Sequence, residues 1–128
     1  MATKYIVVEG CELKFQNGGG PNTAISINPQ QVSTKVKAGG KGVYKTLKFS
    51  ISGYNGQAIT NSDGTGNGSI TATAQKCKAE GKFVILEGDV SASITISGTT
   101  TTQSGKQNVT ATEVVKVTKA GQDKVKGS

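Results

Sequence analysis

The chain lacks the side chains on which most enzymes depend. Its 128 residues include no histidine, arginine or tryptophan. Without histidine the commonest general base is missing, and neither a Ser-His-Asp nor a Cys-His arrangement can be assembled. The eight carboxylates are densest around Glu87 and Asp89, and carboxylates on a lysine-rich surface are usually only solvated. We therefore expect a protein that is not an enzyme and has no catalytic residues.

The same absences argue against a nucleic-acid partner and against a metal-binding site. All 15 positive residues are lysines, although proteins that grip phosphates or read bases favour the planar fork of arginine. Zinc prefers sets of four Cys and His ligands, and only Cys11 and Cys77 are present, as weak candidates. The turn-rich run from Asp63 to Asn67 lacks the closing Glu of a calcium loop, because Ala74 stands in that place. We expect no metal, no cofactor and no nucleic-acid partner.

Long apolar runs are missing as well. No stretch approaches the ~18 residues that a membrane span needs. Near the N-terminus, the apolar run ends at Glu9 and is too short for a signal peptide. The sequence therefore predicts a protein that is made and kept in the cytoplasm before use, with no membrane-spanning segment. Its length predicts a single domain over residues 1–128, with a polar C-terminal tail from about residue 120.

What the chain does contain is glycine, serine, threonine and short alternating patterns. The clearest pattern places Leu47, Phe49 and Ile51 on one face, with polar residues between them. A period of two predicts half-buried strands, so the fold class is all-β. Strands are expected over residues 4–8, 11–15, 24–28, 47–52, 70–75, 93–97 and 109–118, and polar loops over residues 17–22, 53–68 and 99–105.

One pattern recurs along the chain. Residues 35–43 match residues 76–84 at an offset of 41, and each copy is followed by an alternating strand that ends in Ile-Ser-Gly. Coincidence between Lys/Gly-rich turns is the alternative explanation. We interpret the recurrence as two strand-turn-strand units in which glycine turns the chain where a Cβ atom would clash. The repeat-turn positions that we single out are Gly40, Lys41, Val43, Gly81, Lys82, Val84, Gly88 and Asp89.

These motifs resemble a known family. The opening, residues 5–15, is similar to the first strand pair of PAAR-like proteins, which cap the spike of contractile injection machines. Residues 81–89 resemble that family's recurring turn, a Gly-Lys-x-Val followed shortly by Gly-Asp. Residues 40–43 carry the first part of the same turn, and residues 117–122 would close the domain. The resemblance covers most of the chain as scattered short turns.

Together with the recurring pattern, the resemblance implies a compact conical or sandwich-like domain of short antiparallel strands with two pseudo-repeated strand-turn-strand units, assembled in the bacterial cytoplasm. Its function would be that of a structural tip, or piercing cap, on a trimeric β-helical spike. The machine would be a type VI secretion system, a phage tail or an extracellular contractile particle, and the cap would be ejected toward a target cell. An effector protein is a further partner that the resemblance allows. Zinc-bound tips in the family use His and Cys ligands, and this chain has no His.

Two other functions remain open from the sequence. A non-catalytic carbohydrate-binding or adhesive β module would suit the Ser/Thr-rich and Gly/Asn-rich composition, although sugar-binding faces usually present more aromatic rings. A tail-tube or baseplate subunit would need a larger apolar interface than the sequence obviously supplies.

Overall fold

The fold is built from strands and turns. The computed structural model describes residues 3–16, 23–27 and 31–128, and this part of the chain contains no helix; none, therefore, could cross a membrane. The expected all-β class is confirmed. The strands are β1 (Lys4–Tyr5), β2 (Glu12–Phe15), β3 (Ala24–Ile27), β4 (Val32–Ala38), β5 (Lys41–Tyr44), β6 (Lys48–Gly56), β7 (Ile59–Ser69), β8 (Lys78–Ala79), β9 (Lys82–Phe83), β10 (Ile94–Thr102), β11 (Gly105–Glu113), β12 (Val115–Lys119) and β13 (Lys126–Gly127).

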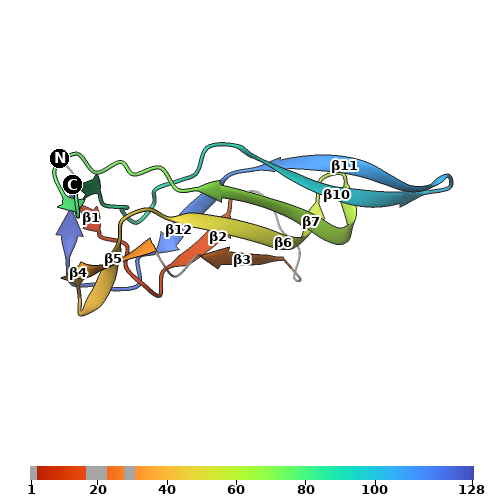
Figure 1. Ribbon diagram of the computed structural model, residues 1–128. Helices are drawn as coiled ribbons and strands as arrows, with labels where there is room; N and C mark the ends of the chain where they lie inside the picture. The colour runs from red at the N-terminus through yellow and green to blue at the C-terminus, as the bar shows by residue number, and fades with distance from the viewer. Residues whose placement is uncertain (1–2, 17–22, 28–30) are drawn as a thin grey trace.

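The molecule is elongated, and its two ends differ. One antiparallel sheet has the strand order β11-β10-β7-β6-β3, and the β10–β11 hairpin reaches out from it to form one end (Figure 1). Both chain termini lie at the opposite end, together with the short strands β1, β4, β5 and β13 (Figure 1). Four two-stranded sheets accompany the large one, namely β1-β13, β2-β12, β4-β5 and β8-β9.

The large sheet buries one face in the main core, as the alternation predicts. Leu47, Phe49 and Ile51 are at most 4% exposed, whereas the residues between them face solvent. Ile94 and Ile96 of β10 pack into the same cluster, which we call the sheet core. The opposite face is covered by short polar side chains that lie in register across the strands: Ser26, Ser50, Asn67, Thr95 and Thr112.

The polar loop predicted for residues 53–68 is wrong, because this segment forms most of the β6–β7 hairpin. Its glycines lie where the sheet core leaves no space for a side chain. A Cβ atom on Gly64 would lie 2.7 Å from Cβ of Tyr54, and one on Gly68 would lie 2.7 Å from Cγ2 of Ile94. Glycine has a low intrinsic preference for strands, but the close approach of these large side chains requires it here.

Several other boundaries also differ from the prediction. Residues 99–105 are not a loop, since β10 runs to Thr102 and β11 starts at Gly105. The last predicted strand, residues 109–118, is divided between β11 and β12. Residues 70–75 form only an isolated bridge at Ile70, although their burial alternates as predicted. The polar segment after residue 120 supplies an additional short strand, β13. The predicted loop over residues 17–22 lies outside the described residues.

Tyr54 anchors a polar contact inside the sheet core. Its hydroxyl donates a hydrogen bond to Oε2 of Glu113, and both side chains are buried. Burial, reinforced by the Glu113 carboxylate, raises the pKa of Tyr54 to about 12, so the phenol remains a neutral donor. The ring of Phe15 packs edge-on against the Tyr54 ring at 5.4 Å. The hydrogen bond therefore joins β6 to β11 across the core, and the ring contact joins β6 to β2 at the edge of the core.

A methyl group at Gly64 should overpack the sheet core. We expect Gly64→Ala to lower the free energy of unfolding by about 1–3 kcal/mol, because Cβ of Tyr54 and Cγ2 of Ile96 would have to move. Urea unfolding checks this value, with Thr65→Ala on the exposed face of the same strand as the control. Equal stability of the two variants would contradict the packing described for β7.

Candidate docking surface

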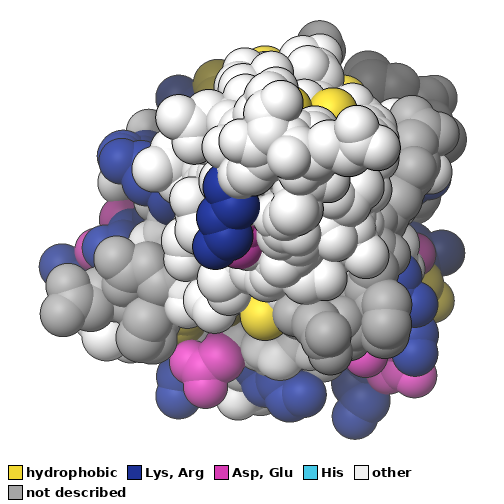
Figure 2. All heavy atoms as spheres, turned by 90° about the vertical axis from the view of Figure 1, so that its right-hand side faces the viewer, with side chains coloured by type: hydrophobic (Ala, Val, Ile, Leu, Met, Phe, Trp, Pro, Cys, Tyr) yellow, Lys and Arg dark blue, Asp and Glu magenta, His cyan; other side chains and the backbone are white. Residues whose placement is uncertain are grey.

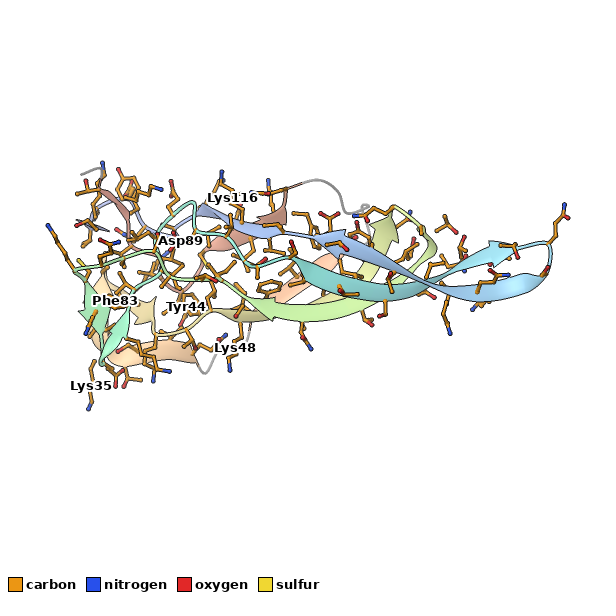
Figure 3. All side chains as sticks on the ribbon, turned by 90° about the horizontal axis from the view of Figure 1, so that it is seen from above. Lys35, Tyr44, Lys48, Phe83, Asp89 and Lys116 are labelled. Atoms are coloured by element: carbon orange, nitrogen blue, oxygen red, sulfur yellow. The ribbon has the colours of Figure 1, made fainter. Side chains whose placement is uncertain are left out.

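Three two-stranded sheets, which we call the ladders, make up the end that carries the termini (Figures 1 and 3). The β4–β5 and β8–β9 ladders are hairpins at the two copies of the sequence repeat. Ala38 pairs with Lys41 in the first, and Ala79 pairs with Lys82 in the second. The β1–β13 ladder joins the two ends of the chain, and there Gly127 pairs with Lys4. The three ladders thus share one pairing pattern.

The two hairpins use the same tight turn. Its central residues are Gly39 and Gly40 in one ladder and Glu80 and Gly81 in the other, all with positive φ. Two such residues define the type I′ turn, which matches the twist of a hairpin. A Cβ atom on Gly40 or Gly81 would meet nothing within 4 Å. The repeat therefore requires glycine for its backbone angle, and the predicted steric clash is wrong.

A third copy of the repeat is not evident in the linear sequence, because its two halves lie at opposite ends of the chain. Residues 124–127 read Lys-Val-Lys-Gly, against Lys-Val-Lys-Ala at 35–38 and Lys-Cys-Lys-Ala at 76–79. The second half of this third copy lies near the N-terminus. Residues 4–11 match residues 82–89 at an offset of 78, and Lys, Val, Glu and Gly or their close equivalents recur in order. A comparison that treats the chain as circular would have found it.

Successive ladders also contact one another in the same way. The Val7 amide donates to the Ile85 carbonyl at 2.9 Å, and the Glu87 amide donates to Tyr5 at 2.9 Å. At equivalent positions the Tyr44 amide donates to Val7 at 3.4 Å, and the Glu9 amide donates to Gly42 at 3.0 Å. One head-to-tail contact is therefore made twice. Repetition of such a contact produces a ring when the rotation closes.

Side chains connect the remaining pair of ladders. Glu80, in the β8–β9 turn, accepts a hydrogen bond from the Ser33 hydroxyl of β4 and lies 3.9 Å from Nζ of Lys45. The hydrogen bond from Ser33, with help from Lys45 and Lys35, lowers the pKa of the Glu80 carboxyl. All three ladders are thereby in mutual contact around a common centre.

Equivalent residues also occupy equivalent layers of the interior. Ile6, Val43 and Val84 lie together in a second cluster of buried side chains, which we call the ladder core. The next residue along the chain in each copy, Val7, Tyr44 or Ile85, packs instead in the sheet core. Pairing, contacts and burial together describe an approximate threefold arrangement of the ladders. The ladder core contains Ile6, Val8, Ala38, Val43, Ala74, Ala79, Val84 and Leu86.

The segments that follow β1 and β9 contain matching turns. The Cys11 amide donates to Val8 at 3.1 Å around Gly10, and the Asp89 amide donates to Leu86 at 3.0 Å around Gly88. Each glycine has φ near +95°, as the third position of a type II turn requires. Asp89 is buried and accepts hydrogen bonds from the Leu86 amide, at 2.8 Å, and from the amide and hydroxyl of Thr73. Its role is structural.

The two cysteines lie in different surroundings. Cys11 packs against the sheet core and Cys77 against the ladder core, and both are free thiols. Burial raises the pKa of the Cys11 thiol to about 11, which disfavours the thiolate that would bind a metal. Within the described part of the chain, no three potential metal ligands lie together. The structure thus brings together the repeat-turn positions and not the cysteines.

Lysines and exposed apolar side chains characterise the surface of the ladders. Phe83 and Val125 are 41% and 37% exposed, and both belong to ladders or their flanks. Nζ of Lys78 lies 4.7 Å from the centre of the Phe83 ring, and Nζ of Lys126 lies 4.8 Å from that of Tyr5. Cation–π contacts therefore hold two equivalent lysines over two equivalent rings. Figure 3 shows Phe83 and Lys35 together at this end of the molecule.

The opposite end has almost no charge. Residues 99–108, which form the β10–β11 hairpin tip, include Lys106 as their single charged residue. Seen from this end, most of the surface facing the viewer is neither charged nor hydrophobic (Figure 2). Asp63 accepts hydrogen bonds from the amide and hydroxyl of Thr99, and these bonds lower the pKa of its carboxyl. Asn61 also bonds Thr99 and Thr101, so side chains tie β7 to the projecting hairpin.

Comparison with protein-family models, with curated proteins and with solved structures finds no match to this chain.

Proposed function

We propose that the protein is a PAAR-like structural tip on the trimeric spike of a contractile injection machine. The observation that supports this proposal best is the approximate threefold arrangement of the ladders within a single chain. A single chain placed on the axis of a trimer meets three identical surfaces. It can satisfy all three only if it presents three similar surfaces of its own.

The strands of the ladders suit such a contact. In the described part of the chain, β4, β8 and β13 each pair with one other strand. Next to two of these strands, the Lys76 and Cys77 amides donate to the Ser128 carbonyl. In this proposal the remaining backbone edges pair with the end of a β-helical spike by β-augmentation, and the lysines nearby oppose pairing between free copies. The tapering outline at the other end (Figure 1), and a hairpin tip whose single charged residue is Lys106, suit the leading point of a cap. Docking on a spike and forming its leading point need no catalytic residues, so we propose a protein that is not an enzyme.

One observation favours the adhesive β module as a second candidate. The exposed face of the large sheet presents short hydroxyl and amide side chains across five strands, including Ser50, Asn67 and Thr95. Such groups can hydrogen-bond to a glycan, but the face offers no aromatic ring for stacking against a sugar. Retention of a soluble glycan on this face, abolished by bulky substitutions at Ser50 and Thr95, would establish that alternative.

The proposal is tested by finding the protein on particles. A short epitope tag is inserted between Gln103 and Ser104, in the exposed β10–β11 turn and far from the ladders. Particles purified from the organism that encodes the chain are then labelled with gold and viewed by negative-stain electron microscopy. A single label at one end of a sheathed tube is expected. Label along the tube would indicate a tube or baseplate subunit, and protein found only free or on the cell surface would overturn the proposal.

A further inference from the structure

The ladders concentrate positive charge in a threefold pattern. Each ladder carries three exposed lysines at equivalent positions, and the repeat segments (residues 35–43, 76–84, and 124–127 with 4–11) contain two acidic residues, Glu9 and Glu80. In the described part of the chain, ion pairs join Lys45 to Glu80 and Lys119 to Glu12, and neither of these lysines belongs to a ladder. The nine ladder lysines are Lys35, Lys37 and Lys41, then Lys76, Lys78 and Lys82, then Lys124, Lys126 and Lys4.

Some of these lysines are held in place by the fold. Nζ of Lys41 donates to the Gly121 carbonyl at 3.1 Å and lies over the turn at Gly10. Lys4 lies in the same way over the equivalent turn at Gly88. Lys78 is fixed over the ring of Phe83. Positioned charges of one sign, repeated around an axis, favour a partner that carries the opposite sign with the same symmetry.

We propose that the ladder end binds a homotrimeric protein surface with Asp or Glu side chains around its threefold axis, one ladder over each subunit. This inference rests on the proposed function and adds the chemistry of the partner to it. A homotrimer presents each carboxylate three times, which matches three equivalent sets of lysines. Nucleic acid would also attract lysines, but its backbone has no threefold axis, and the chain has none of the arginines that bind phosphate bidentately.

Charge reversal tests the inference, because opposed like charges disfavour an interface. The variant Lys37→Glu, Lys78→Glu, Lys126→Glu changes one equivalent lysine in each ladder. The control variant Lys14→Glu, Lys48→Glu, Lys106→Glu changes the net charge equally at exposed lysines outside the ladders. Both carry the tag between Gln103 and Ser104, and thermal unfolding shows whether each remains folded. We expect about tenfold fewer labelled particle ends for the ladder variant and unchanged labelling for the control.

The outcomes separate the two proposals. If the tagged wild-type chain labels no particle ends, the proposed function fails. If the wild type and both variants label equally, the function stands and the acidic partner is wrong. An equal loss for both variants would show that overall charge matters and the ladders do not, which also overturns the inference.

A second measurement uses the unaltered chain and does not depend on variants that fold. A carbodiimide joins lysine amines directly to carboxylates with which they are in contact, and mass spectrometry of treated particles identifies the joined residues. We expect the same partner carboxylate to be linked to Lys37, Lys78 and Lys126, since each lysine faces one copy of one subunit. Links to unrelated carboxylates, links from one ladder alone, or protection of these lysines by nucleic acid instead of protein would overturn the inference.

Discussion

Asp89→Ala is expected to lower the free energy of unfolding by about 3 kcal/mol, among the largest effects of any single substitution in this chain. The Asp89 side chain is 3% exposed and accepts hydrogen bonds from the Leu86 amide and from the amide and hydroxyl of Thr73. Alanine would leave these donors without their acceptor in a site from which water is largely excluded. Urea unfolding followed by circular dichroism measures the loss.

Two variants control this experiment. Asp89→Asn can keep a carbonyl oxygen at the Oδ2 position, where it accepts from the amides of Leu86 and Thr73, and its NH2 group then faces only the Thr73 hydroxyl, so this variant should cost less than alanine. Asp123→Ala removes an exposed carboxylate near the C-terminus and should leave stability nearly unchanged. A loss below 1 kcal/mol for Asp89→Ala would contradict the structural role given to this turn.

Joining the two ends of the chain should stabilise the protein. In the β1–β13 ladder Gly127 pairs with Lys4, just as Ala38 pairs with Lys41 across a two-residue turn. A connection that keeps Ser128, adds one glycine and continues at Lys4 in place of residues 1–3 would form a third hairpin of the same design. Closing a loop of this length removes chain entropy from the unfolded state, so we expect a gain of about 3–4 kcal/mol.

Reopening the ring elsewhere provides the control. A circular permutant that carries the same connection but begins at Gly40 and ends at Gly39 has open termini in the β4–β5 turn. This permutant should fold with a stability close to that of the linear wild type, because its unfolded chain has two free ends and regains the entropy that cyclisation removes. If neither the cyclic chain nor the permutant folds, the β1–β13 ladder is not equivalent to the two hairpins.

The alternating segments of the fold could be predicted from the sequence because their pattern is local. Leu47, Phe49 and Ile51 need only a period of two to indicate which face is buried, and they lie as predicted. The glycine-rich strand β7 could not be predicted in this way. Gly64 and Gly68 are required by Tyr54 and Ile94, whose proximity exists only after the sheet has formed.

The candidate site was partly visible in the sequence. The repeat at residues 35–43 and 76–84 correctly marked two hairpins, and both have the same two-residue turn. The third ladder was hidden because its halves, Lys126–Gly127 and Lys4–Tyr5, are at opposite ends of the chain. The pairing of β13 within the polar segment from residue 120 could not be predicted for the same reason, since a short Lys/Gly segment has no apolar pattern to reveal it.

The central claim is that one copy of this chain sits on a threefold axis and contacts its partner through the ladders. Cryo-electron microscopy of the particle end, reconstructed without imposed symmetry, tests it most directly. We predict a single copy, with β4–β5, β8–β9 and β1–β13 each over one subunit of a trimer and the β10–β11 hairpin pointing outward. Three copies around the axis, or contact through the hairpin end with the ladders free, would contradict it.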